Sequence, residues 1–514
     1  MKRSVKLLFT ALAVYLVLLL LLVAAEAGSP NASIRSFGDA LWFSLITMTT
    51  VGYGDLSPVT TAGRVLGIVF ALCSIGILTA LISLGLSLIS GEWIPRLRLR
   101  LGKKQRWYAF SEENEDSAAL AAALREKDPD CLLLFPAGEK IADGANVVRL
   151  SCDAEELVRM RGSRDGITLF LMGPEPRENY TRGLEAVEKG IDCCCMADIA
   201  GEGMPAQMEL FSPNEAMSRS YWKEHPLKDG ERCVVLIGCG AAGSALLERA
   251  LLTNVFEPGR TVEYHVFADT ADFAALHPEI VRALSGEDPE EDRLCFHAES
   301  WTQAHTLLAR ADRIILCMES DEDNFQICET LKRWYGCRAA LYAHLAEEVP
   351  DFVAFGERSE SMRPEFVMKD ELNRRARMMN DIYNEGAANP AQWKELSPFL
   401  RQSNIAAADH LIVKARFLLG EETLTELTTD DCRRAYARFR QLYETQADLL
   451  QKMEHRRWMR FHQMYNWRYA PVRDNARRFH PLLLPYEQLS ASEQRKDAYA
   501  WEMLGRLGER SDGS

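Results

Sequence analysis

The sequence predicts a membrane-bound α-helical unit, followed by two doubly wound α/β domains and a small, mainly α-helical domain at the carboxyl end. Two long apolar stretches lie within residues 1–90 and predict the membrane unit. After residue 90, short apolar runs typical of strands alternate with amphipathic segments typical of helices, and this alternation occurs twice. At 514 residues, the chain has room for two or three further domains beyond the apolar stretches.

The apolar stretches, Val5 to Ala25 and Val65 to Ser90, each have the length of roughly 20 residues that a bilayer-spanning helix needs. Basic residues gather within residues 2–6 and again from Arg96 to Arg106. Because cytoplasmic segments carry an excess of lysine and arginine, we expect both termini in the cytoplasm. The expected location is the plasma membrane, as a multi-pass protein in contact with lipid.

A secretory signal peptide is the alternative interpretation of residues 1–27. A basic start, an apolar run and Ala25-Glu26-Ala27 imitate its three-part pattern. Cleavage would remove the first span and export a domain whose scattered cysteines are unsuited to an oxidising compartment. The second apolar stretch would then need another explanation.

A short helix and a glycine-containing segment are predicted between the two spans. Ser36, followed three positions later by Asp39, predicts the start of a helix that continues to Thr47. The sequence Thr-Met-Thr-Thr-Val-Gly-Tyr-Gly-Asp then occupies Thr47 to Asp55. Glycine at alternate positions permits backbone conformations that a side chain opposes, so that successive carbonyl groups can face one axis. Such carbonyl oxygens can replace water around a cation.

This segment resembles the selectivity filter of potassium channels, and its setting resembles a two-transmembrane-helix pore. The resemblance implies potassium ions at the carbonyl oxygens of Thr50, Val51, Gly52 and Tyr53, with the Thr50 hydroxyl closing the inner end. It also implies a homotetramer, in which four copies of the segment line one pore. The filter residues implied by the resemblance are Thr50, Val51, Gly52, Tyr53, Gly54 and Asp55.

Two further features of the predicted pore each have two interpretations. Trp42 and Phe43 resemble the aromatic cuff that braces such filters, or they anchor the protein at the lipid interface. In the second span, the family's usual hinge glycine is replaced by Ser74. Gly76 is a possible gating hinge, because glycine weakens a helix by about 1 kcal/mol relative to alanine. Equally, Gly76 fits the close packing of helices that small residues allow.

Composition excludes several classes of site. A formal net charge of −14 argues against nucleic acid as a partner, and we interpret the basic cluster at residues 96–106 as a topology signal that contacts phospholipid headgroups. The 13 cysteines form no Cys-x-x-Cys pair, and the 10 histidines form no zinc-spaced set. Neither a disulfide framework nor a metal site in the large carboxyl-terminal part is indicated.

The first α/β run has an acidic segment, Ser111 to Asp116, where a phosphate-binding domain would need glycines. A purely structural repeat and a cation-binding acidic loop are both compatible with this segment. The strands are predicted near Arg106 to Phe110, Cys131 to Phe135, Val147 to Leu150, Ile167 to Leu171 and Asp192 to Met196.

The second run carries the dinucleotide fingerprint in its required context: strand Val234 to Ile237, the turn Gly-Cys-Gly-Ala-Ala-Gly, and a helix from Ser244 to Leu252. In such a Rossmann-like domain the glycines allow a tight turn, close approach of phosphate, and close packing of helix on strand. An acidic residue closes the next strand and is placed to accept from ribose hydroxyls. These residues are, in order, Gly238, Gly240, Gly243 and Asp269. They predict an adenine nucleotide such as NAD, ATP, ADP or a cyclic dinucleotide.

A pore followed by paired nucleotide-fold domains resembles potassium channels with regulator-of-potassium-conductance (RCK) domains. The resemblance covers roughly Ser36 to His344. In that family eight such domains form a gating ring, and four chains with two domains each would supply all eight. A ligand would gate the pore only if it bound two ring states with different affinities.

The carboxyl-terminal region resembles a ryanodine-receptor-type repeat domain over Leu449 to Leu507. The resemblance rests on Glu454-His455-x-x-Trp458, on Trp467-Arg468-Tyr469 and on the Pro-Tyr segment within His480 to Leu489, although Ala470-Pro471 replaces the usual glycine. Its aromatic and basic residues form either a nucleotide pocket or the core of a helical module. The candidate pocket residues are Trp458, Trp467, Tyr469, Arg473 and Arg478.

These observations predict a potassium-selective channel that a cytosolic nucleotide gates, and no enzymatic activity. A membrane-tethered oxidoreductase would account only for the fingerprint, because no proton donor or substrate-pocket motif accompanies it. A membrane-anchored signalling scaffold would leave the filter segment unexplained. The predicted parts are a pore domain at 1–95, a basic linker at 96–106, α/β domains at 107–228 and 229–345, a helical connector at 346–445, and a carboxyl-terminal domain at 446–510.

Overall fold

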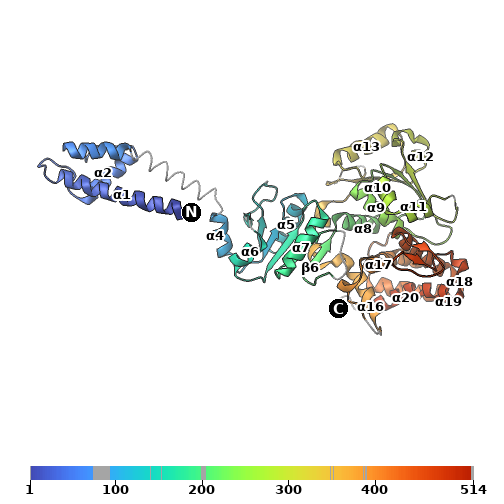
Figure 1. Cartoon of the computed structure of the whole chain (residues 1–514). Coiled ribbons are helices and arrows are strands. Elements are labelled where there is room, and N and C mark those ends of the chain that lie inside the picture. The colour runs from blue at the N-terminus through green and yellow to red at the C-terminus, as the bar shows by residue number, and fades with distance from the viewer. Residues whose placement is uncertain are drawn as a thin grey trace. The chain divides into compact units, whose positions relative to one another are not determined.

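The chain divides into two compact units, Met1–Leu101 and Gly102–Ser514 (Figure 1). The computed structural model describes residues 2–72, 93–138, 140–151, 153–197, 204–286, 288–347, 349–350, 352–385, 387 and 390–510.

The first unit is helical. Among the described residues, no helix is both long enough and apolar enough to cross a membrane. The expected capping box is present, because Ser36 Oγ accepts from the Asp39 amide at 3.2 Å and the Asp39 carboxylate accepts from the Ser36 amide at 2.8 Å. The helices are α1 (Lys2–Glu26), α2 (Phe37–Met48), a helix described over residues 61–72, and α4 (Trp93–Leu101).

One buried carboxylate fastens the end of α1 to the start of the helix at residue 61. Glu26 is fully buried and accepts from the Thr60 hydroxyl at 2.7 Å, the Thr60 amide at 3.0 Å and the Val59 amide at 3.1 Å. A side chain at Gly63 would come within 2.0 Å of this carboxylate and would displace it from these hydrogen bonds. The surrounding apolar core consists of Leu19, Leu22, Ile34, Ala40, Phe43 and Phe70.

The second unit contains two six-stranded sheets, and each has the doubly wound order in which the first strand lies third from one edge. The first sheet has the order β3-β2-β1-β4-β5-β6, with every pairing parallel. The five predicted strands are confirmed, and β6 was missed. The strands are β1 (Trp107–Phe110), β2 (Leu132–Phe135), β3 (Val147–Arg149), β4 (Ile167–Leu171), β5 (Asp192–Met196) and β6 (Met208–Phe211). The helices are α5 (Glu115–Lys127), α6 (Ala154–Arg161), α7 (Pro176–Glu188) and α8 (Pro213–Glu224).

The second sheet repeats the order as β9-β8-β7-β10-β11-β12, again with every pairing parallel. Its sixth strand lies in the region predicted to be a mainly helical connector. The strands are β7 (Cys233–Ile237), β8 (Glu263–Phe267), β9 (Arg293–His297), β10 (Arg313–Leu316), β11 (Ala340–His344) and β12 (Val353–Phe355). The helices are α9 (Ala241–Thr253), α10 (Ala271–Leu276), α11 (Pro278–Leu284), the 3₁₀ turn η1 (Trp301–Gln303), α12 (His305–Arg310) and α13 (Asp321–Trp334).

Alternation along β7 explains why helices cover both faces of this sheet. Val235 and Ile237 point toward α12 and α13, whereas Val234 and Leu236 join a core with α9 and α11. Figure 1 shows α12 and α13 on one side of the sheet and α9 to α11 on the other. A strand buried on both faces is apolar throughout, as β7 is.

The remaining residues form a helical region that packs on the second sheet through the same core as α9. The long helix α18 crosses the predicted domain boundary at residue 445, and its backbone leaves helical geometry only at Gln446 (φ −135°, ψ 37°). Phe439 before this kink stacks on Trp501 of α20 at 6.0 Å, so the predicted connector and carboxyl-terminal domain share a core. The elements are α14 (Arg358–Ser361), α15 (Pro364–Lys369), η2 (Glu371–Asn373), α16 (Arg374–Asn384), η3 (Trp393–Glu395), α17 (Pro398–Leu419), α18 (Thr429–Met464), β13 (Arg468–Tyr469), β14 (Phe479–His480), η4 (Tyr486–Gln488), α19 (Ala491–Gln494), η5 (Arg495–Ala498) and α20 (Tyr499–Gly508).

A buried ionic triad joins α17 to α18. The Glu454 carboxylate accepts from Lys414 Nζ at 2.6 Å and from Arg457 at 2.7 Å and 3.0 Å. Burial opposes ionisation of Glu454, but Arg457 and Lys414 outweigh it and lower the pKa of this carboxyl from 4.5 to about 2. Its stabilising effect is therefore present above pH 4.5 and is lost as the pH falls towards 2.

We expect Glu454→Gln to destabilise the full-length protein by about 3–5 kcal/mol at neutral pH, because it leaves Lys414 and Arg457 buried without a counter-charge. The variant should also lose less stability than the wild type between pH 4.5 and 2. Thermal unfolding followed by tryptophan fluorescence measures both effects. Glu444→Gln, the same change at an exposed position of α18, is the control. Equal stability of the two variants would contradict the role of the triad.

Candidate functional site

The segment after α2 has an alternating backbone. Thr50, Gly52 and Gly54 lie in the left-handed region with φ of 58°, 58° and 73°, whereas Val51 and Tyr53 between them do not. Alternation of this kind turns successive carbonyl groups to one side instead of to opposite sides. Thr50 is notable because a side chain opposes this conformation by about 1–2 kcal/mol. The backbone thus has the conformation that the glycine spacing predicted.

Hydrogen bonds tie this segment to the end of α2. The Ile46 carbonyl accepts from the Val51 amide at 3.0 Å and from the Gly52 amide at 3.1 Å. The Thr49 and Thr50 amides donate to the last turn of the helix as well. These bonds satisfy carbonyl groups that a helix end otherwise leaves unpaired, and they fix where the segment begins.

Trp42 braces the other end of the segment. Its indole Nε1 donates to Asp55 Oδ2 at 3.0 Å, and its ring stacks on Tyr53 with centroids 6.4 Å apart and planes 7° apart. This geometry supports the bracing interpretation for Trp42. Phe43 instead packs in the core of the first unit, so neither interpretation describes it. Gly76, the possible hinge, lies outside the described residues and stays a prediction.

The glycine-rich turn in the second unit has the geometry of a tight strand-to-helix connection. Gly238 has φ of 99°, and a side chain there would come within 2.4 Å of the Cys317 carbonyl oxygen. A side chain at Gly243 would come within 2.4 Å of the Gly238 carbonyl oxygen. Gly240 is the N-cap of α9, so the positive end of that helix dipole lies at the turn. Glycine is thus required sterically at positions 238 and 243.

Asp269 lies at the carboxyl edge of β8, as predicted. It lines an open cleft of about 770 Å³ together with residues at and after the end of β9, including His297 and Trp301. Its Oδ1 accepts from the Ala271 amide at 3.1 Å. The cleft and the glycine turn occupy the same edge of the sheet, where α/β proteins bind ligands.

Sequence reasoning missed Glu319, which follows β10. Its carboxylate lies beside the turn, 3.6 Å from the position of a side chain at Gly240. No pattern in the sequence identifies Glu319. It lies near the turn because β10 is next to β7 in the sheet, and this strand order is known only from the structure. The Glu319 carboxylate would repel a bound phosphate. A nearby cation, or rotation of the Glu319 side chain away from the phosphate, would remove this repulsion.

In the first sheet, arginines pair with the acidic segment. Glu113 accepts from Arg149 Nε at 2.9 Å and from the amides of residues 141 and 142 at 2.8 Å and 2.9 Å. Arg358 pairs with Glu115 at 3.1 Å and also contacts Asp116. These contacts support the structural interpretation over the cation-binding one.

The five candidate pocket residues of the carboxyl-terminal region do not share one environment. Trp467 is 5% exposed and packs against Phe399 at 5.3 Å, as the core interpretation expects. Trp458 packs against His462 and His480, whose pKa values burial lowers. Tyr469 is 51% exposed. Arg473 and Arg478 are exposed, and they bond to Asn475 Oδ1 and the Tyr465 carbonyl, respectively.

One cluster among the described residues has metal-like spacing: Cys233, Glu263 and His265. Arg310 already bonds to it, donating to Glu263 at 2.7 Å and lying 3.3 Å from His265 Nε2. The guanidinium compensates the carboxylate charge that a metal ion would otherwise require. We assign no metal to this cluster.

Comparison with known proteins shows what the first unit is similar to. Residues 7–90 match the family model described as "Ion channel". The chain is 47% identical over 75 residues to "Voltage-gated potassium channel" of Aeropyrum pernix, covering 15% of this chain and 23% of that one. It is 48% identical over 56 residues to human "Potassium voltage-gated channel subfamily A member 4", covering 11% and 8%. The chain spans less than a quarter of the length of either relative.

The chain therefore carries an ion channel domain at its amino end, followed by two parallel α/β sheets. Fold comparison finds the structure described as "GsuK Channel", with a TM-score of 0.38 and 14% identity over 72% of this chain and 100% of that one. It also finds "GsuK channel bound to NAD", with a TM-score of 0.36 and 13% identity over 72% and 85%. The ryanodine-receptor-type repeat is not shown and stays a prediction.

We expect Gly243→Ala to destabilise the protein by about 1–3 kcal/mol, because its methyl group would overlap the Gly238 carbonyl oxygen. The measurement is thermal unfolding of the full-length protein. Gly230→Ala is the matched control, since a side chain there meets no atom within 4 Å. A melting temperature of Gly243→Ala equal to that of the control would contradict the tight turn.

Proposed function

We propose that the protein is a potassium-selective channel of the plasma membrane, assembled as a homotetramer with both termini in the cytoplasm. The observation that carries the proposal is the left-handed backbone at alternate positions from Thr50 to Gly54, within the matched channel domain. Four such segments around one axis would present rings of carbonyl oxygens to a dehydrated ion. Val5 to Ala25 and Val65 to Ser90 would cross the bilayer in contact with lipid.

A cytosolic adenine nucleotide is the proposed regulator. The tight turn at Gly238 to Gly243, the amino end of α9 and the cleft at Asp269 support it, because they lie on one edge of the second sheet. In the proposed tetramer, two α/β domains from each of four chains form a ring. The nucleotide opens or closes the pore only if it binds two arrangements of the ring with different affinities.

For conduction, the full-length protein reconstituted into liposomes should pass potassium in preference to sodium, and barium should block the current. Gly52→Ala should lower the potassium-to-sodium permeability ratio at least about tenfold, since each subunit incurs about 1–2 kcal/mol of backbone strain. Gly28→Ala, at a position with no atom within 4 Å, should leave the ratio unchanged. Absence of a potassium-selective current under every nucleotide condition would refute the proposal.

For regulation, Gly240→Asp should abolish nucleotide binding and shift the open probability, because it places a carboxylate at the amino end of α9. Calorimetric titration of the full-length protein with NAD, ATP and ADP measures binding, and single-channel recording measures open probability. Gly230→Asp introduces the same charge on an open surface and serves as the control. Unchanged affinity in Gly240→Asp would rule out the site.

A further inference from the structure

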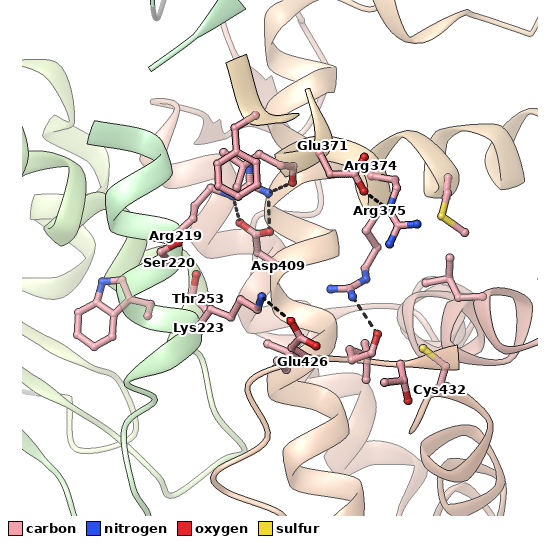
Figure 2. Close-up of a pocket in the computed structure, with 18 of the residues that line it drawn as sticks. Arg219, Ser220, Lys223, Thr253, Glu371, Arg374, Arg375, Asp409, Glu426 and Cys432 are labelled. Atoms are coloured by element: carbon pink, nitrogen blue, oxygen red, sulfur yellow. Dashed lines mark hydrogen bonds and ion pairs between the residues drawn. The ribbon is translucent and has the colours of Figure 1, made fainter. Parts of the chain in front are cut away.

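A cavity of about 500 Å³ lies between α8, α9, α16, α17 and the start of α18, apart from both sites described above. Its volume is within the range of small-molecule sites, roughly 300–1,000 Å³. Figure 2 shows polar side chains entering it from several helices, among them Arg219, Arg375 and Asp409. These residues are far apart in the sequence, so the fold alone brings them together.

The lining of this cavity is strongly basic. Seven arginine and lysine side chains face three carboxylates there, in a protein whose overall formal charge is −14. A basic concavity with protein walls raises the local concentration of anions. Apolar side chains, among them Phe366 and Met378, form part of the wall and would accommodate an uncharged portion of a ligand.

Some of the cations are neutralised by resident carboxylates. Asp409 bonds to Arg219 at 2.8 Å through both of its oxygens and to Arg249 at 3.0 Å. Arg374 pairs with Glu371 at 2.7 Å. These pairs do not neutralise all of the positive charge of the cavity.

The positive charges of Arg375 and Lys223 are less well neutralised by carboxylates. Arg375 donates to the Leu427 carbonyl oxygen at 3.1 Å, and among the described residues no carboxylate lies within ion-pair distance of it. Burial accordingly lowers the pKa of this guanidinium. Lys223 reaches Glu426 only at 3.8 Å, and the Glu426 side chain is 79% exposed. An exposed pair of this kind contributes little and is readily exchanged for a ligand anion.

The start of α18 also lines the cavity, through Thr428, Thr429 and Cys432. Thr428 is the N-cap of this helix, and its hydroxyl accepts from the Asp431 amide at 3.1 Å while the Asp431 carboxylate accepts from the Thr428 amide at 3.0 Å. Because Asp430 and Asp431 lie in this first turn, the positive charge of the cavity comes from its arginine and lysine side chains. Arginine supplies planar, paired donors that match phosphate oxygens.

We propose that this cavity binds a small molecule bearing two or more phosphate groups, with Arg375 and Lys223 as its principal contacts. Such a ligand would connect α8, which shares the core of the second sheet, to α16 of the helical region. The site is separate from the glycine turn and does not depend on the proposed channel function.

Calorimetric titration of the full-length protein in detergent, with inorganic pyrophosphate as the probe, tests this assignment. Pyrophosphate should bind, and orthophosphate should bind at least tenfold more weakly. Arg375→Gln should weaken pyrophosphate binding at least tenfold, and Arg375→Lys, which keeps the charge but loses the paired donors, should weaken it less. Arg177→Gln, at an exposed position on α7, should bind as the wild type does.

A gain in affinity excludes misfolding as the explanation. Glu426→Gln removes a carboxylate from the rim and should tighten pyrophosphate binding about threefold. Unchanged affinity in both Arg375→Gln and Glu426→Gln would overturn the assignment, as would wild-type protein that binds no pyrophosphate. Binding that Gly240→Asp abolishes and Arg375→Gln preserves would place the anion at the glycine turn and also overturn it. Failure of this proposal leaves potassium flux unaffected, so the two are distinguishable.

Discussion

The packing of the helical region on the second sheet depends on Asp409. This carboxylate, on α17, bonds to Arg219 of α8 and Arg249 of α9 at 2.8–3.0 Å. Burial opposes its ionisation, but the two guanidinium groups outweigh burial and hold the pKa of Asp409 below its ordinary value. Removing one member of a buried pair typically costs about 3–5 kcal/mol, because the partner charge stays buried. Asp409 thus joins three helices at the cavity, and Glu215 of α8 supports it at 3.6 Å from Arg219 and 3.5 Å from Arg249.

Local patterns in the sequence predicted much of the fold. The apolar run Val234 to Ile237 predicted a strand, because a parallel strand that is buried on both faces is apolar throughout. The glycines and the helix that follow it predicted the connection. The alternating backbone at Thr50 to Gly54 followed from glycine spacing in the same way. Strands β6 and β12 were missed because Met-Glu-Leu-Phe and Val-Ala-Phe are short, and their pairing with β5 and β11 determines their conformation.

The missed features depend on contacts between residues that are distant in the chain. Nothing near Arg219 in the sequence signals that Asp409, 190 positions later, neutralises it. The carboxyl-terminal region was expected as a separate module, yet Phe439 and Trp501 belong to one core. A resemblance built on aromatic spacing selected residues such as Trp467, which is buried. It could not separate a buried core position from a ligand contact, because large aromatics are common in both.

The resident carboxylates also determine which anions the basic cavity can select. A monoanion in the cavity is attracted by Arg375, but it must compete with Asp409 and Glu426 for the other cations. Its binding also removes water from both the anion and the cation, which costs free energy. A ligand with two phosphate groups offers more charge than the exposed Glu426 and can displace it from Lys223 without disturbing the buried Asp409 pairs. Selectivity for polyanions therefore follows from the contrast between one buried and one exposed carboxylate. Binding through Lys223 and Arg375 would add a connection between α8 and α16 to the one between α8 and α17 that Asp409 maintains.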